Sequence, residues 1–133
     1  MAMELMIVDV EELPVHEVAP GDRVRVIAAE SNGAKHMAVV ERWLDPGVST
    51  PLHRHPAGTE EVVWVKAGCA EFTVGDETAT VPAEHTVVVP ALAAHAYRSV
   101  GDEPLHLRCR YSAARPLVLD EDGLEAGPEV PGT

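Results

Sequence analysis

The sequence is poor in cysteine, aromatic residues and positive charge. Its two cysteines, Cys69 and Cys109, cannot supply the disulfide framework of a small secreted domain, and both lie within apolar segments. We therefore expect reduced thiols in a cytoplasmic protein. The ten Lys and Arg are outnumbered by 22 Asp and Glu, which gives a formal net charge of −12. Because phosphate binding requires clustered cations, this balance argues against nucleic acid and anionic membrane surfaces as partners.

Sequence signals of several other protein classes are also missing. No segment approaches the roughly 18 apolar residues that a membrane-spanning helix needs. Residues 1–15 carry acidic side chains throughout and lack the basic start of a signal peptide. No window shows a sustained helical period, and no internal repeat is found. The motifs H-E-x-x-H, C-x-x-C, G-x-S-x-G and the glycine-rich phosphate loop are absent, which argues against the enzymes that depend on them.

What the sequence does contain is a series of short apolar or alternating runs, separated by many of its eleven prolines and ten glycines. The runs are Arg23–Ala28, His36–Trp43, Glu61–Lys66, Ala70–Val74, Thr78–Val81, Thr86–Val89, His95–Val100 and Leu105–Tyr111. Strands at this spacing predict an all-β sandwich or small barrel.

The length of 133 residues suits one domain with terminal extensions. We predict an N-terminal arm or edge strand over residues 1–20, the barrel over 21–116 and a C-terminal tail over 117–133. The tail is acidic and rich in Pro and Gly. We therefore expect it to be mobile, or to be ordered only by a neighbouring subunit.

Two histidines stand one residue apart in the segment P-L-H-R-H-P. In an extended chain successive side chains alternate, so His53 and His55 project from one side while Arg54 points away. The flanking prolines suit an extended segment and disfavour a helix. Two imidazoles on one face can chelate a metal ion, but the pair alone is also compatible with histidines that face solvent.

Adjacent glutamates, Glu60 and Glu61, open the run E-V-V-W-V-K and are the next candidate ligands. If Glu60 faced the interior, the alternation of a strand would bury Lys66 as well, and an unpaired buried lysine is costly. Glu61 would instead face inward together with valines. We therefore favour Glu61 as the ligand, with Glu60 as a solvated loop carboxylate.

A third histidine, His95, follows the run V-V-V-P and completes a set of three imidazoles and one carboxylate. Such nitrogen and oxygen donors suit one divalent transition metal, whether Fe, Mn, Co, Ni, Cu or Zn. Two further residues are candidate catalytic groups. Tyr97 shares a face with His95 and could donate a hydrogen bond to a substrate, or form the barrel wall. His36 could line the cavity as a general base, or lie on the surface.

The pattern of these residues resembles the single-domain cupins. The first cupin motif, G-(X)5-H-X-H-(X)3–4-E-(X)6-G, is matched by Gly47, His53, His55, Glu61 and Gly68, with one extra residue before the glutamate. The second motif, G-(X)5-P-X-G-(X)2-H-(X)3-N, is matched at its proline and histidine. Glu84, Leu92 and Ser99 stand where cupins have Gly, Gly and Asn.

The resemblance implies a double-stranded β-helix, or jelly-roll barrel, in which His53, His55, Glu61 and His95 bind one divalent metal at the barrel mouth. It implies an enzyme that acts on a small organic molecule, most simply a dioxygenase-type oxidoreductase with the substrate on the metal. Two alternatives are a non-redox isomerase or polyketide cyclase that uses the metal as a Lewis acid, and a metal- or metabolite-binding protein without turnover. Cupins commonly form homodimers, and outward-facing Trp43 and Trp64 could anchor such an interface.

Overall fold

The computed structural model describes residues 5–132 as strands joined by turns and two short 3-10 helices. Its elements are η1 (Val10–Glu12), β1 (Val15–Ala19), β2 (Asp22–Ala28), η2 (Glu30–Asn32), β3 (Ala38–Leu44), β4 (Glu61–Ala67), β5 (Cys69–Val74), β6 (Glu77–Pro82), β7 (Thr86–Val89), β8 (His95–Ser99), β9 (Leu105–Tyr111), β10 (Leu117–Leu119) and β11 (Glu125–Pro128). Each of the eight runs predicted from the sequence overlaps one of the strands β2 to β9. The described residues contain no helix long and apolar enough to cross a bilayer.

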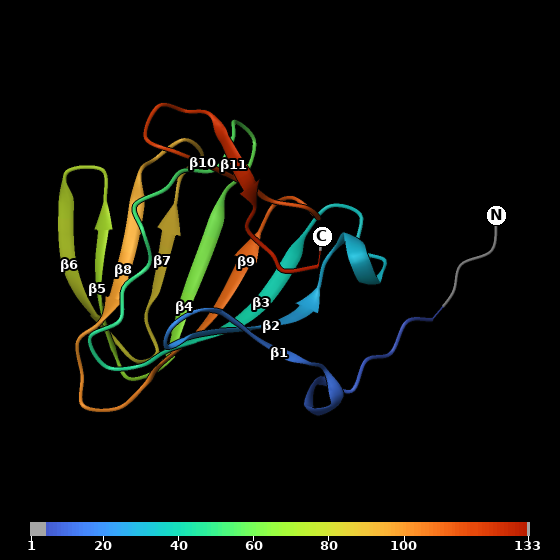
Figure 1. Cartoon of the computed structure of the whole chain (residues 1–133), viewed down its shortest axis with the longest axis horizontal. Helices are drawn as coiled ribbons and strands as arrows, with labels where there is room; N and C mark the ends of the chain where they lie inside the picture. Colours follow the sequence, from blue (N-terminus) through green and yellow to red (C-terminus); the bar gives the residue numbers. More distant parts are fainter. Residues whose placement is uncertain (1–4, 133) are drawn as a thin grey trace.

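The strands form a jelly-roll barrel made of a large and a small sheet (Figure 1). The six-stranded sheet has the order β1-β2-β3-β9-β4-β7, and the three-stranded sheet has the order β6-β5-β8. All of the strand pairs within them are antiparallel. The fold class is therefore the all-β barrel that the cupin resemblance implies.

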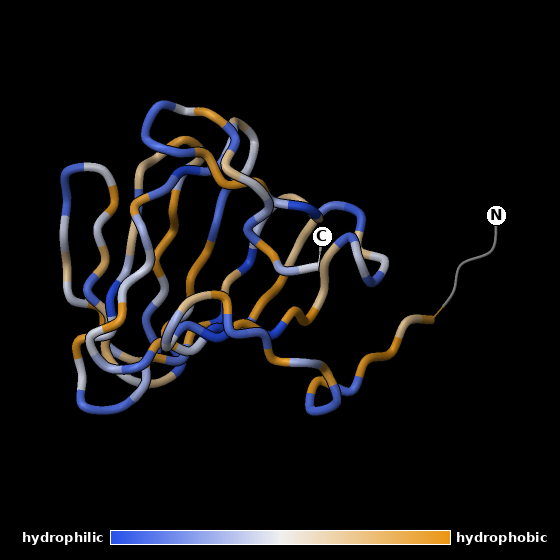
Figure 2. The backbone as a smooth tube through the Cα atoms, viewed as in Figure 1, coloured by the Kyte–Doolittle hydropathy of each residue, from blue (hydrophilic) through white to orange (hydrophobic). Residues whose placement is uncertain are grey.

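Alternation along the strands separates the barrel interior from its outer surface. In β4, Val63 and Val65 are fully buried, whereas Trp64 and Lys66 are partly exposed on the outer face. There the Lys66 ammonium lies 3.8 Å from the centre of the Trp64 ring. The turns and loops at the barrel ends are mostly hydrophilic in Figure 2, while the strands carry much of the hydrophobic sequence. The inward valines and the outward Lys66 of β4 have the register that the cost of burying Lys66 predicts from the sequence.

Two turns keep a left-handed backbone without the glycine that cupin motifs place there. Glu84 has φ 65° and Leu92 has φ 67°. The backbone N–H of Glu84 donates to Val65 O at 2.7 Å, and that of Leu92 donates to His55 O at 3.0 Å. A side chain in this conformation costs about 1–2 kcal/mol relative to a right-handed one. Hydrogen bonds to the framework hold both turns despite this cost.

The C-terminal segment differs from the mobile tail expected from its composition. Strands β10 and β11 pair as an antiparallel hairpin, which lies across one end of the barrel (Figure 1). Arg54 and Leu119 exchange two backbone hydrogen bonds, at 3.0 and 2.7 Å, and so attach the hairpin to the histidine loop. Val130 is 1% exposed. The apolar segment Leu117–Leu119 supplies the strand, and the acidic turn beyond it obscures this short signal in the overall composition.

The N-terminal segment runs along the outside of the barrel. Strand β1 pairs only with β2 and forms one edge of the six-stranded sheet. Before it, the chain extends away from the barrel (Figure 1), and Leu5 and Ile7 are 86% and 81% exposed. Residues 1–4 of the predicted arm and residue 133 of the predicted tail lie outside the described part of the chain.

Candidate metal centre

Four side chains from three parts of the chain meet inside the barrel. His53 and His55 come from the loop between β3 and β4, Glu61 begins β4, and His95 begins β8. One potential ligand atom from each lies within 4.8 Å of the others. All four side chains are buried, and His53, the most accessible residue, is 6% exposed. The structure therefore brings together the four residues that the sequence analysis selected.

The histidine loop is fixed to β8 by backbone hydrogen bonds. His53 N donates to His95 O at 3.0 Å, and His95 N donates to His53 O at 2.9 Å. This antiparallel bridge places the two imidazole centroids 4.2 Å apart. The pairing explains how histidines that are 42 positions apart in the sequence share one site.

The carboxylate is that of Glu61. Its Oε1 atom lies 3.1 Å from Nε2 of His55 and 3.1 Å from Nε2 of His95. Glu60 is exposed, and its backbone N–H donates to Ser112 Oγ at 2.8 Å. The pleat of β4 thus separates two adjacent carboxylates into one that faces the histidines and one that faces solvent.

Backbone carbonyls orient all three imidazoles. Nδ1 of His53 donates to Pro51 O at 2.8 Å, that of His55 to Leu117 O at 2.9 Å, and that of His95 to Ala93 O at 2.9 Å. A carbonyl only accepts hydrogen bonds, so each Nδ1 carries the proton. In the neutral ring Nε2 then keeps its lone pair, which is the form that binds a metal.

Two atoms of the cluster have no hydrogen-bond partner although they are buried. They are Nε2 of His53 and Oε2 of Glu61. A buried polar atom without a partner costs about 1–3 kcal/mol, more when it is charged. A divalent cation among the four side chains would satisfy both atoms, and three imidazoles with one carboxylate suit a transition metal. The residues therefore fit the metal that the resemblance implies.

The ionisable groups of the cluster are strongly coupled in the metal-free protein. Burial lowers the pKa of His55, but the hydrogen bond to Glu61, the charge of Glu61 and the hydrogen bond to Leu117 O together outweigh burial and leave that pKa raised. For Glu61, burial raises the pKa, and the hydrogen bonds from His55 and His95 outweigh it, so the pKa is lowered. Without a metal the site favours protons shared between imidazole and carboxylate, and a metal must displace these protons.

Comparison with known proteins identifies the family. Residues 42–111, more than half of the chain, match the cupin domain family. The chain belongs to the cupins. It is 28% identical over 114 residues to the protein described as polyketide synthase CurC from Streptomyces cyaneus, which covers 86% of this chain and 73% of that protein.

Solved cupin structures share the fold. The polyketide cyclase RemF from Streptomyces resistomycificus superposes with a TM-score of 0.74 at 21% identity, over 90% of each chain. An RmlC-like cupin from Shewanella frigidimarina gives a TM-score of 0.71 at 19% identity, over 86% of this chain and 96% of that one. Oxalate decarboxylase from Lactobacillus farciminis gives 0.74 at 24% identity, over 84% of this chain and 34% of that one.

Of the two catalytic candidates in this cupin, Tyr97 is buried and His36 is exposed. Tyr97 is 1% exposed, and its hydroxyl accepts a hydrogen bond from Arg42 Nη1 at 2.9 Å. Burial raises the pKa of Tyr97 well above its ordinary value, so the hydroxyl stays protonated. His36 lies in the bend before β3, where it is exposed, which matches the surface position that the sequence left open for it. The structure does not bring His36 into the histidine cluster.

A set of interior polar residues escaped the sequence analysis. Arg42 pairs through Nη2 with Asp22 Oδ2 at 2.6 Å and through Nη1 with Glu129 Oε1 at 3.5 Å. The Tyr111 hydroxyl donates to Glu129 Oε1 at 3.1 Å. Alternation along its run predicts that Arg42 faces inward. Nothing near it in the sequence, however, marks Asp22 or Glu129 as its partners, which are 20 and 87 positions away.

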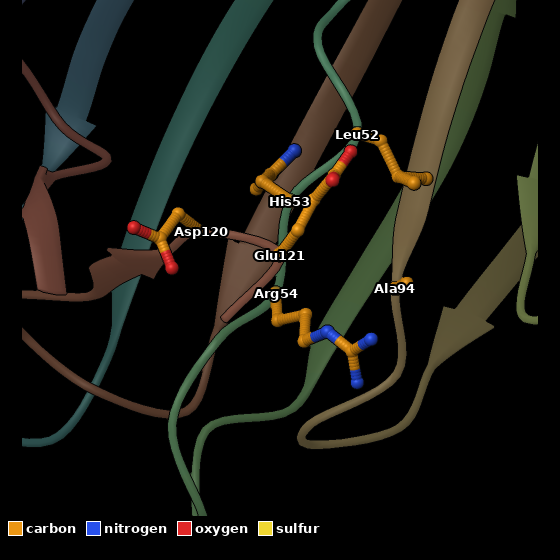
Figure 3. A pocket seen from close by; sticks show the side chains of 6 residues that line it. All are labelled: Leu52, His53, Arg54, Ala94, Asp120 and Glu121. Carbon is orange, nitrogen blue, oxygen red and sulfur yellow. The ribbon is translucent and has the colours of Figure 1, made fainter. Parts of the chain in front are cut away.

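A small pocket reaches the cluster from outside the barrel. Its cavity volume is about 10 Å³, and it is lined by Leu52, His53, Arg54, Ala94, Asp120 and Glu121. Figure 3 shows the His53–Arg54 segment beside the turn of the β10–β11 hairpin, which contributes Asp120 and Glu121. Ligand pockets usually measure about 300–1,000 Å³, whereas this one has room for about a single water molecule.

Proposed function

We propose that this cupin is a metal-dependent enzyme that closes a ring in a polyketide chain, with the metal held by His53, His55, Glu61 and His95. The observation that carries the proposal is the buried cluster of three Nε2 atoms and one carboxylate, within which two polar atoms lack partners. The similarity to the protein named polyketide synthase CurC along most of the chain supports the choice of substrate class. So does the likeness in fold to the cyclase RemF over nearly its whole length.

A divalent metal at this site would act as a Lewis acid that polarises a carbonyl group of the substrate. Ring closure joins an enolised methylene carbon of a poly-β-ketone to one of its ketone carbons, and it consumes no oxidant. Tyr97 would serve as a neutral hydrogen-bond donor to a substrate oxygen, because Arg42 holds its hydroxyl and its pKa is raised. Burial of the cluster excludes water, which strengthens these electrostatic contacts.

The experiment begins with elemental analysis of the freshly purified protein. The metal-free protein is then given Zn²⁺ and a synthetic linear poly-β-ketone thioester under anaerobic conditions, and ring formation is followed by ultraviolet absorbance and mass spectrometry. We expect cyclisation without oxygen, and loss of activity with a chelator. A protein that neither contains nor binds a divalent metal would overturn the proposal.

A second candidate is the dioxygenase that the sequence resemblance predicts first. The donor set suits a dioxygenase as well as a cyclase, because three imidazoles and a carboxylate also hold Fe(II). Oxygen consumption in step with loss of a catechol or diketone, together with inactivity under anaerobic conditions, would favour the oxygenase over the cyclase. Stoichiometric binding of the ketone without turnover in either atmosphere would instead favour the non-catalytic binding protein.

We also propose a homodimer and a cytoplasmic location. Trp43 and Trp64 lie partly exposed on the outer face of the six-stranded sheet, and exposed Trp is enriched at protein interfaces. Cys69 and Cys109 are both free thiols, in keeping with a reducing compartment. Sedimentation of the protein, and of a Trp64→Ala variant, tests the dimer; a monomer at all concentrations would refute it.

A further inference from the structure

Glu129 is a buried carboxylate beside the candidate metal centre. It lies just after β11, its side chain is 10% exposed, and its Oε1 atom is 3.7 Å from Nε2 of His53. This distance is too long for a hydrogen bond. Glu129 is not one of the four groups whose ligand atoms lie within 4.8 Å of one another, so its carboxylate lies next to the centre, on the His53 side.

The partners of Glu129 hold it in place without fully balancing its charge. The Tyr111 hydroxyl donates to Oε1 at 3.1 Å. Arg42 approaches the same atom at 3.5 Å but makes two shorter bonds to Asp22, at 2.6 and 2.8 Å. The guanidinium therefore serves mainly Asp22, and Glu129 remains a buried negative charge that is only partly compensated. The nearest further group is His53, whose Nε2 has no hydrogen-bond partner.

The hairpin that carries Glu129 also orients a second imidazole. Leu117 O, in β10, accepts the hydrogen bond from Nδ1 of His55 at 2.9 Å. The hairpin is attached to the histidine loop through Leu119 and Arg54, and Glu129 N donates to Pro116 O at 2.9 Å. One C-terminal segment thus lies against two of the three histidines.

We infer that Glu129 is an outer carboxylate of the metal centre, next to His53, and that a bound divalent cation and the C-terminal hairpin stabilise each other through it. The inference rests on the metal centre of the proposed function and adds to it a residue and a segment. It also explains why the hairpin is ordered although its composition is that of a mobile tail. An acidic segment with few apolar side chains gains little from burial, so an attractive charge at its base is what keeps it in place.

The first test measures Zn²⁺ affinity by chelator competition in the parent protein and two variants. Glu129→Gln keeps the shape and the acceptor oxygen but removes the charge. Glu125→Gln makes the same change at an exposed position of β11 and is the matched control. We expect Glu129→Gln to weaken binding about ten-fold or more, the effect of losing an outer partner of a metal site, and Glu125→Gln to leave it unchanged.

An affinity of Glu129→Gln within about two-fold of the parent would overturn the inference. If the parent itself binds no divalent metal, the proposed function fails as well, so the two failures are distinguishable. A difference in the Co²⁺ absorption spectrum between the parent and Glu129→Gln, with none between the parent and Glu125→Gln, would support a carboxylate that lies beside the ion.

Hydrogen exchange in the parent and the two variants supplies a second test that does not depend on activity. The amides of Leu119 and Glu129 hold the hairpin through backbone hydrogen bonds. We expect added Zn²⁺ to slow their exchange in the parent and in Glu125→Gln but not in Glu129→Gln, while the buried Val63 amide stays protected in all three. If Glu129 had a purely structural role, Glu129→Gln would change the exchange rates of these amides equally with and without metal. That result, or exchange in the parent that ignores the metal, would refute the coupling.

Discussion

Replacing Glu61 with Gln tests both the metal centre and the strand register on which it depends. The substitution keeps the shape of the side chain and removes its charge. Glu61 is 1% exposed and its Oε1 atom lies 3.1 Å from two imidazole nitrogens, so solvent cannot enter to compensate for the lost charge. Glu60 is exposed and provides an adjacent control with the same chemistry.

The magnitude follows from removing one partner of a buried charge pair, which costs about 3–5 kcal/mol. At about 1.4 kcal/mol for each ten-fold change, the dissociation constant for Zn²⁺ rises between roughly a hundred-fold and several-thousand-fold. An exposed substitution stays within about 0.5 kcal/mol, so Glu60→Gln should change that constant by about two-fold at most.

The assay is titration of the metal-free variants with Zn²⁺ in the presence of a competing chelator. Thermal unfolding of the same metal-free samples checks that Glu61→Gln is folded before its affinity is interpreted. Equal losses in the two variants, or a larger loss in Glu60→Gln, would refute the assignment of the ligand and with it the register of β4 relative to the histidines.

Three further predictions concern pH, a buried ion pair and a turn. The pKa values of His53 and His55 are raised in the metal-free protein, so their contribution to its stability is present below about pH 6.5 and is lost as the pH rises through the raised values. Bound metal should instead dissociate as the pH falls through about 6, because protons then compete for the imidazoles. Full retention of the metal at pH 4.5, measured by elemental analysis after dialysis, would contradict this. Arg42→Met leaves Asp22 without its partner and should lower the free energy of unfolding in urea by about 3–5 kcal/mol; a loss under about 1 kcal/mol would mean that the pair is not desolvated. Glu84→Gly should be more stable than Glu84→Ala by about 1 kcal/mol because only glycine relieves the positive φ, and equal melting temperatures would refute the strain.

The barrel strands and three of the four clustered residues could be predicted from the sequence because they rest on local signals. Alternation in E-V-V-W-V-K placed Glu61 inward once Lys66 was required to face out, and the structure has this register. The spacing of His53 and His55 needed only an extended chain. His95 was selected because it completed the donor set, and the second cupin motif then supported it; its pairing with His53 spans 42 positions, and no local pattern reports that pairing.

The interior network of Arg42 and Glu129 could not be predicted in the same way. Glu129 lies in a segment whose composition indicates a mobile tail, and nothing in a charge count separates it from Glu121 or Glu125, which remain exposed. Its burial depends on a hairpin anchored by backbone hydrogen bonds to residues more than 60 positions earlier. Contacts of this kind arise from the tertiary arrangement, and single-sequence reasoning has no access to them.

The charges inside the barrel argue for a bound cation independently of the sequence motif. Three carboxylates share the barrel interior with the Arg42 guanidinium, those of Asp22, Glu61 and Glu129, whereas the buried Glu41 pairs with His106. Arg42 offsets Asp22 through two short bonds, which leaves the other two carboxylates beside imidazoles that are neutral when they bind a metal. Two negative charges facing neutral nitrogen donors in a dry site are costly unless a dication lies between them or protons take its place. The metal-free protein must therefore bind protons that the metal-loaded protein releases, and proton release on addition of Zn²⁺ at pH 7 would measure this exchange directly.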